Sequence, residues 1–216
     1  MAMNSYYNDT LYPLQNKVLK IIEGLQTPFY LTGGTALSRC HFNHRYSDDL
    51  DFFVNKDPNF INLAETIILE LQKNFEVEIN IKSETYVSLK LNKILKIDLV
   101  NDIPFRYGEL RESDIFSKVD NIENILSNKL SALISRDEPK DVVDIWMISK
   151  STKVDWKGIY KSANSKAAGI FPPDVAKRLT EFPVELLDRI KWVENKPEVE
   201  IFIAEINLIC DSMLKV

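Results

Sequence analysis

The sequence has few cysteines and no long apolar run, and each shortage excludes a class of protein. The two cysteines, Cys40 and Cys210, lie far apart and outside any metal-ligand spacing, which favours a reduced setting. No apolar run approaches the ~20 residues that a membrane-spanning helix needs, and the N-terminus lacks the basic-then-apolar layout of a signal peptide. We therefore expect a cytoplasmic protein with no membrane partner.

An excess of positive charge is also missing. The net charge is −5 at pH 7, which argues against indiscriminate nucleic-acid binding, because such binding depends on neutralised phosphates. A net charge of −5 still allows one face of the protein to be locally basic. With 216 residues, of which 45% are hydrophobic and 27% charged, the chain has the composition of a soluble globular protein with one large or two small domains.

The most informative stretch, residues 29–54, reads FYLTGGTALSRCHFNHRYSDDLDFFV. Its pattern predicts a short apolar strand, a turn at Gly33 and Gly34, a short helix and a second strand over residues 49–54. Glycines between a strand and a helix let backbone amides approach a phosphate closely, and the helix N-terminus favours anions. This turn is therefore a candidate phosphate cradle.

The second strand of this stretch carries two acids on one face. Because side chains alternate along a strand, Asp49 and Asp51 point to one side, whereas the apolar Leu50 and Phe52 point to the other. Two neighbouring carboxylates repel each other unless a cation or another partner lies between them. Carboxylate oxygens are hard ligands, so Mg²⁺ is the cation that they favour. The stretch as a whole predicts a metal–nucleotide site.

The ordered set GGTAL followed by HRYSDDLDFF resembles the AbiEii/AbiGii toxin branch of the DNA polymerase β-like nucleotidyltransferase superfamily. The superfamily pattern is a Gly-Gly or Gly-Ser turn, a short helix, Asp-x-Asp on a strand and a third carboxylate on a later strand. Here the turn is Gly33-Gly34 and the pair is Asp49-x-Asp51. Gly34 stands where many relatives have serine, and the hydroxyl of Thr35 follows one position later. The resemblance extends over residues 28–150.

A third acid lies in the last of three predicted strands. Alternating patterns predict strands over residues 77–81, 87–91 and 94–100. In the last of these, ILKIDLV, Lys96 and Asp98 share the face opposite the apolar side chains. Asp98 therefore stands where the resemblance implies the third metal ligand. The alternative is a solvent-facing acid on an edge strand.

The remaining segments complete the predicted fold. Apolar spacing indicates helices over residues 11–25 and 60–71 and over closing segments 184–194 and 198–214, with further helices from Ile122 and from Pro139, the latter capped by Asp137. Residues 101–118 have no clear period and are interpreted as a crossing segment. We predict an α+β fold with a polymerase β-like nucleotidyltransferase domain, a mixed sheet with flanking helices, over residues 1–118. A helical C-terminal domain follows over residues 119–216.

By resemblance, the helical part contributes further site residues. Family members have a Lys-Leu-x-Ala-like helix followed by Arg, Lys-Asp and a further Asp, which here are Lys129, Arg136, Lys140, Asp141 and Asp144. The resemblance implies that Lys129 contacts the triphosphate and that Asp141 completes or supports the active site. The alternative is a surface helix with ordinary ion pairs between residues four apart, worth only ~0.3–0.5 kcal/mol each.

A run of lysines follows this segment. Lys153, Lys157 and Lys161 step by four residues, so on a helix they form a lysine stripe along one face. Such a stripe could follow an RNA backbone, although it is more often simply a solvated face.

These features together predict a nucleotidyltransferase that uses Mg²⁺, or Mn²⁺, to move a nucleotidyl group from a nucleoside triphosphate to an acceptor hydroxyl. Asp49, Asp51 and Asp98 are the predicted metal ligands, and Asp98 could also accept the proton of the acceptor. The residues predicted to contact phosphate are the cradle of Gly33, Gly34 and Thr35 and the basic side chains of Arg39, Arg45, Lys129 and Arg136.

The biological role is suggested by family analogy alone. It would be the toxin of a toxin–antitoxin or phage-defence pair, with a cognate antitoxin as partner and RNA, tRNA in particular, as acceptor. One alternative is a transferase that modifies a small molecule such as an aminoglycoside, which the lysine stripe disfavours, because a small acceptor needs no long basic track. The other is a non-catalytic nucleotide-binding module, which the complete set of three carboxylates disfavours.

Overall fold

The computed structural model describes residues 3–103 and 105–216; Met1, Ala2 and Pro104, the last within the predicted crossing segment, lie outside this description. The chain forms two compact units. The first comprises Met1–His41, Tyr46–Pro104 and Glu109–Asp120, and the second comprises Phe42–Arg45, Phe105–Gly108 and Asn121–Val216. The second unit therefore includes two short segments from the N-terminal half of the chain.

The first unit is built on a mixed β-sheet. In the described residues this sheet has seven strands in the order β3-β4-β5-β2-β1-β7-β6. Strand β2 runs antiparallel to β1 and parallel to β5, so the strands that carry Asp51 and Asp98 are direct neighbours. Asp49, predicted to lie on the same strand as Asp51, immediately precedes β2. The strands are β1 (Tyr30–Thr32), β2 (Leu50–Asn55), β3 (Val77–Lys82), β4 (Tyr86–Leu91), β5 (Leu95–Asp102), β6 (Arg111–Ser113) and β7 (Phe116–Val119).

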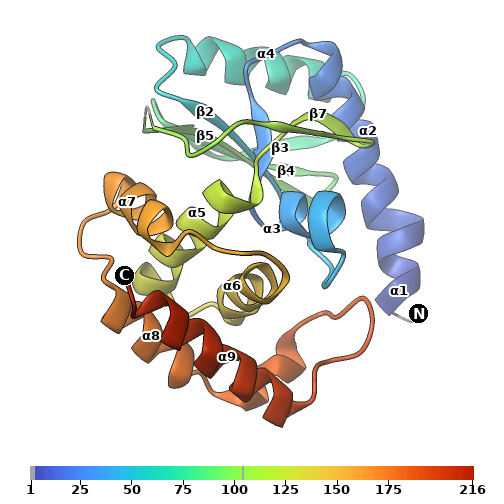
Figure 1. Ribbon diagram of the computed structural model, residues 1–216. Coiled ribbons are helices and arrows are strands. Elements are labelled where there is room, and N and C mark those ends of the chain that lie inside the picture. The colour runs from blue at the N-terminus through green and yellow to red at the C-terminus, as the bar shows by residue number, and fades with distance from the viewer. Residues whose placement is uncertain (1–2, 104) are drawn as a thin grey trace. The chain divides into compact units, whose positions relative to one another are not determined.

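Helices cover this sheet because each has an apolar face to bury. Helix α2 contacts β7 and helix α4 contacts β3, and α2 also packs against α4. Figure 1 shows α4 along one side of the sheet and α3 on the opposite side. The helical segments of this part of the chain are α1 (Met3–Tyr6), the π-helix η1 (Tyr7–Leu11), α2 (Tyr12–Gly24), α3 (Gly33–Thr35), the π-helix η2 (Ala36–Phe42), which directly continues α3, and α4 (Phe60–Gln72).

The two faces of the sheet differ in chemistry. Leu50 and Phe52 on β2 and Ile97 on β5 are fully buried and belong to the apolar face. The residues that alternate with them, Asp51 and Asp98, belong to the other face. The strand period thus places both carboxylates on the side of the sheet away from this apolar core.

The second unit is helical. Helix α5 packs against α6, α7 and α8, and α9 packs against α6 and α8. Buried side chains of this unit include Leu130, Val143 and Phe202. The elements are α5 (Ile122–Ser135), α6 (Pro139–Ser151), α7 (Trp156–Lys166), α8 (Pro172–Thr180), the 3₁₀-helix η3 (Val184–Arg189) and α9 (Val199–Met213). Within residues 3–103 and 105–216, none of the helices has the length and apolar character needed to cross a membrane.

The predicted α+β architecture, a mixed sheet with flanking helices followed by a helical part, is confirmed. The main difference concerns residues 101–118, where the structure has the hairpin of β6 and β7. Strand β7 pairs in parallel with β1 through Leu31 and Val119, which are distant in sequence. Each strand of the hairpin has only three or four residues, too few to give a period.

Smaller differences concern helix boundaries. Helix α6 has Glu138 at its N-cap position, one residue after the predicted cap Asp137. The predicted helix over residues 184–194 is only the short η3, which ends at Arg189. Helix α8 begins at Pro172, a position where proline is tolerated because the first helical amide needs no partner.

Candidate active site

The glycine turn lies directly against the first carboxylate strand. Thr32, the last residue of β1, is paired with Asp51 of β2, and Gly33 follows it with a positive φ of 69°. A Cβ atom at Gly33 would collide with the carboxylate oxygen Oδ2 of Asp51. Glycine is required here both by its backbone conformation and by the approach of Asp51. The structure thus brings the predicted cradle and one predicted metal ligand together.

The second carboxylate strand places Asp98 beside Asp51. The two residues are register partners across the parallel pair of β2 and β5. Asp98 is 9% exposed and both of its carboxylate oxygens are engaged. Ser88 Oγ donates a hydrogen bond to Oδ1 at 2.7 Å, and Lys96 Nζ lies 2.5 Å from Oδ2.

Lys96 is a cation built into this face of the sheet. Partial burial lowers the pKa of its ammonium, but the hydrogen bond and charge of Asp98 outweigh that effect, and the charge of Asp49 adds to them. The net result is a pKa above the ordinary lysine value, so the ammonium is protonated at neutral pH. The influence of Asp49 shows that Lys96 lies in the field of two of the three predicted metal ligands.

Asp49 is held through its backbone by Thr35. The Thr35 hydroxyl donates to the carbonyl oxygen of Asp49 and lies 2.9 Å from Ser47 Oγ, and the Thr35 side chain is fully buried. This geometry makes Thr35 a positioning residue for the start of β2. Gly34, within α3, is half-buried.

Thr35→Val should lower nucleotidyl transfer about tenfold, because valine keeps the shape of threonine but loses a hydrogen bond worth about 1 kcal/mol and leaves the Asp49 carbonyl free to shift. Initial rates of transfer, read beside thermal unfolding, measure the effect. Thr35→Ser keeps the hydroxyl and should restore most of the rate. Equal rates for the valine variant and the parent would exclude a positioning role.

Arg39 points toward helix α2. Its guanidinium donates to Gln15 Oε1 at 2.9 Å and to Asn16 Oδ1 at 2.6 Å, and lies 4.3 Å from the centre of the Tyr12 ring. Burial lowers the pKa of Arg39, and the nearby Tyr12 and Cys40 oppose that shift. These contacts direct the guanidinium toward α2, and a phosphate contact by Arg39 stays a prediction.

Five of the other predicted site residues form a second cluster, within the helical unit: Arg45, Lys129, Arg136, Asp141 and Asp144. Asp144 is fully buried and accepts two hydrogen bonds of 2.7 Å from the guanidinium of Arg45. His44 Nε2 lies 2.9 Å from the same carboxylate and Lys129 Nζ lies 2.6 Å from it. We call the set of His44, Arg45, Lys129, Arg136, Asp141 and Asp144 the buried charge cluster.

Asp141 forms the other half of the buried charge cluster. It is fully buried, with Lys129 Nζ at 2.7 Å and Arg136 Nε at 2.8 Å. The alternative of an exposed helix with ordinary ion pairs does not hold for these residues, because the two aspartates are fully buried and Lys129 is 8% exposed. Arg136 is the accessible member, with 51% of its side chain exposed.

Mutual charge shifts the pKa values in the buried charge cluster. Burial raises the pKa of Asp144, but the charges of Arg45 and Lys129 outweigh it and hold that pKa well below the ordinary value. Asp141 also has a lowered pKa, because Lys129 and Arg136 outweigh the effect of burial. Burial likewise lowers the pKa of Lys129, and the two aspartates more than reverse the shift. All three groups are therefore charged at neutral pH.

The fit of the first unit to a divalent metal can be judged from its donors. Among the residues that the structure describes, no three or more His, Cys, Asp or Glu side chains are arranged to hold a metal ion. The chemistry nevertheless fits, because Asp51 and Asp98 present hard oxygen ligands at paired positions and Gly33 leaves the space beside Asp51 clear of a side chain. At Asp98 the place of a cation is taken by Lys96.

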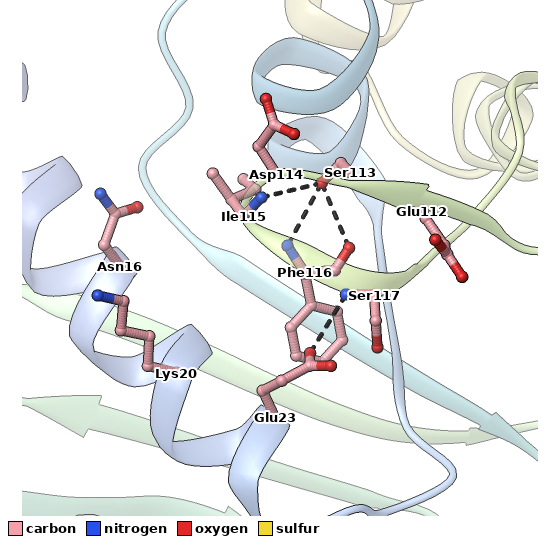
Figure 2. Close-up of a pocket in the computed structure, with 9 residues that line it drawn as sticks. All are labelled: Asn16, Lys20, Glu23, Glu112, Ser113, Asp114, Ile115, Phe116 and Ser117. Carbon is pink, nitrogen blue, oxygen red and sulfur yellow. Dashed lines mark hydrogen bonds between the residues drawn. The ribbon is translucent and has the colours of Figure 1, made fainter.

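A groove of about 460 Å³ lies elsewhere in the first unit, between α2 and the β6–β7 hairpin (Figure 2). Its lining mixes the charges of Lys20, Glu23, Glu112 and Asp114. Glu23 accepts a hydrogen bond from the Ser117 amide at 3.2 Å, which ties the helix to the hairpin. None of the predicted metal ligands lines this groove.

The lysine stripe is only partly helical. Helix α7 begins at Trp156, so Lys157 and Lys161 lie on it, whereas Lys153 precedes it. All three lysines are exposed.

A glycine turn against one carboxylate strand, with a second carboxylate strand beside it, is the arrangement expected of a polymerase β-like nucleotidyltransferase. Residues 18–190 match the family described as "Nucleotidyl transferase AbiEii toxin, Type IV TA system". The chain belongs to this family and is a nucleotidyltransferase, which confirms the resemblance that its motifs carry.

Known proteins are similar over much of the chain. An uncharacterised protein from Aquifex aeolicus is 26% identical over 159 residues, which cover 74% of this chain and 76% of that protein. MenT4, a nucleotidyltransferase toxin from Mycobacterium tuberculosis, superposes with a TM-score of 0.63 at 13% identity and covers 99% of this chain and 86% of its own. The antibiotic-resistance factor ANT(2'')-Ia has a TM-score of 0.56 at 12% identity, over 73% of this chain and 91% of its own. The two structural similarities show a shared fold.

Proposed function

We propose that this nucleotidyltransferase moves a nucleoside monophosphate from a nucleoside triphosphate to a hydroxyl of RNA, with Mg²⁺ or Mn²⁺ held by Asp49, Asp51 and Asp98. The observation that carries the proposal is the register pairing of Asp51 and Asp98 on adjacent strands, next to the glycine turn. The family description supports a role as the toxin of a toxin–antitoxin pair. The proposal further includes a cytoplasmic setting, a cognate antitoxin as partner and tRNA among the acceptors.

The chemistry is an in-line displacement at the α-phosphorus. A bond forms from the acceptor oxygen to phosphorus, the bond to the bridging oxygen breaks, and pyrophosphate leaves. Divalent metal at the three carboxylates would stabilise the attacking and leaving oxygens. Asp98 takes the proton of the acceptor hydroxyl, and the backbone at Gly33 and Gly34 receives the phosphates. Thr35 acts through the position of Asp49.

The helical unit contributes positive charge in this proposal. Three permanent cations of the buried charge cluster, Arg45, Lys129 and Arg136, face two carboxylates, Asp141 and Asp144. The half-exposed Arg136 can present positive charge to a phosphate at the surface. We therefore assign phosphate contact to these three cations and a supporting role to Asp141. Arg39 is a further candidate for phosphate contact.

The division of labour follows the two predicted domains. We propose that residues 1–118 hold metal and triphosphate and that residues 119–216 bind the acceptor and support the phosphate site. The exposed lysines of the second part are the chain's candidate contacts for an RNA backbone.

The proposed reaction should label RNA. The protein, with Mg²⁺ or Mn²⁺, total RNA and each of the four nucleoside triphosphates labelled at the α-phosphate in turn, should transfer label to a defined class of RNA. Omission of the divalent metal should abolish the labelling. Label found on an aminoglycoside and not on RNA would instead support a small-molecule transferase, and label on neither acceptor would support a nucleotide-binding module.

Within the same assay, replacing both Lys157 and Lys161 by glutamine tests the lysine stripe. Each lost phosphate contact should reduce the slope of log affinity against log salt by roughly 0.7–0.9. RNA affinity should fall while nucleotide binding is retained, because the two lysines are not among the proposed triphosphate contacts. Unchanged labelling of RNA at every salt concentration would show that the stripe is only a solvated face.

A further inference from the structure

We propose that Lys96 is a tethered counter-ion of the metal site: it neutralises Asp98 in the free protein and makes metal binding depend on bound nucleotide. This inference rests on the proposed function, because it takes Asp98 as a metal ligand. It adds that Lys96, a residue of the chain itself, competes with the divalent cation for Asp98. The ligand class concerned is a divalent cation that enters together with a polyphosphate.

The first support is that both oxygens of the Asp98 carboxylate already have a partner. One oxygen accepts the hydrogen bond of Ser88, its register partner on β4, at 2.7 Å. The other is 2.5 Å from Lys96 Nζ, and Lys96 lies two residues earlier on the same face of β5. A metal ion can use the second oxygen only after the ammonium has moved away.

The second support is that Lys96 is able to move. Its side chain is 44% exposed, whereas that of Asp98 is 13% exposed. Displacement of the ammonium toward solvent therefore requires no rearrangement of the core. The carboxylate remains in place, held by Ser88 on the neighbouring strand.

The displaced ammonium links metal binding to nucleotide binding. Metal binding breaks the ion pair of Lys96 with Asp98, and the released ammonium then has the same sign of charge as the newly bound metal. A triphosphate offsets this repulsion, because its negative charges attract both the metal and Lys96. Metal alone should consequently bind weakly, and metal with nucleotide should bind much more tightly. By linkage, the metal enhances nucleotide binding by the same factor.

The test is a calorimetric titration of the intact protein with Mn²⁺. It is run without nucleotide and then with the α,β-methylene analogue of whichever triphosphate the parent protein binds best, so that no turnover occurs. Lys96→Gln should bind Mn²⁺ alone about fivefold more tightly, since the competing ion pair is gone. The enhancement of Mn²⁺ affinity by the analogue should shrink by about the same factor.

Lys90→Gln is the matched control. It removes the same charge from the same face of the sheet, whereas the partners of Asp98 among the described residues are Ser88 and Lys96. It should change the affinity for Mn²⁺ alone by less than about twofold. If both variants bound Mn²⁺ alone equally more tightly than the parent, the cause would be the loss of any positive charge near the site. That result would overturn the specific role of Lys96.

Asp98→Asn separates this inference from the proposed function. If the asparagine variant binds Mn²⁺ with the analogue as tightly as the parent does, Asp98 is not a ligand, and the proposed metal site and the counter-ion fail together. If the variant binds weakly while Lys96→Gln binds Mn²⁺ no more tightly than the parent, the metal site stands and the counter-ion role is wrong.

Discussion

Replacing Asp51 by asparagine should reduce nucleotidyl transfer by about a thousandfold or more, equivalent to ~4 kcal/mol of transition-state stabilisation. Asparagine has nearly the size of aspartate, so the packing of β2 and the approach of Gly33 are kept. What is lost is one negative charge at the point where Asp51 is paired with Asp98. A neutral amide oxygen is a much weaker ligand for a divalent cation than a carboxylate.

Initial rates of label incorporation into RNA measure this loss, and thermal unfolding shows whether the fold survives. Asp114→Asn is a suitable control, because Asp114 lines the groove of Figure 2 and is not among the proposed ligands. It should transfer label at close to the parent rate. If Asp51→Asn kept more than about a tenth of the parent activity, the loss would be under ~1.4 kcal/mol and the assigned metal site would be wrong.

The second large effect should be on stability. Asp144→Asn should lower the free energy of unfolding by ~3–5 kcal/mol, because it leaves the buried Arg45 and Lys129 without their shared carboxylate. For a chain of this length that loss corresponds to a fall in Tm of roughly 10 °C. Asp137→Asn provides the control. Asp137 pairs with Arg178 and is 87% exposed, so its removal should cost less than ~1 kcal/mol.

This difference in stability should depend on pH. The pKa of Asp144 is lowered in the folded protein because Arg45 and Lys129 outweigh burial, so its contribution is present above the unfolded value of ~3.9 and is lost as pH falls below it. Lys129 has a raised pKa, so its contribution is lost only as pH rises through and beyond ~10.4. The difference in the free energy of unfolding between the parent and Asp144→Asn should therefore be largest between about pH 4 and about pH 10. A gap that grew in acid would contradict the ionic origin of the effect.

Local patterns predicted the elements that carry the carboxylates. The alternation of acidic and apolar residues around Asp51 and Asp98 gave both the strands and their faces, because a half-buried strand has a period of two. The glycine turn was predicted from its place between a strand and a helix, whereas the approach of Asp51 that excludes a side chain at Gly33 is seen only in the structure. The family match now supports the reading of these motifs together.

Other features depend on pairings that local patterns do not encode. The β6–β7 hairpin joins the sheet through a single long-range register pair, Leu31 with Val119. Thr35 was predicted to face a phosphate, yet its hydroxyl is satisfied inside the fold by Ser47 and Asp49. The alternative of ion pairs between residues four apart does not describe Asp144, which is bound by His44 and Arg45 about a hundred positions away in the chain.

The segment Phe42–Arg45 has a consequence for any attempt to divide this protein. It belongs to the helical unit, although it begins at the last residue of η2 and ends before β2, within the part of the chain that forms the sheet. A contiguous fragment beginning at residue 119 would lack His44 and Arg45 and would leave Asp144 buried without two of its partners. The helical unit is thus not an autonomous module that recombination could transfer by a single cut. Its charged core therefore depends on residues 44 and 45, which lie between η2 and β2 in the sequence.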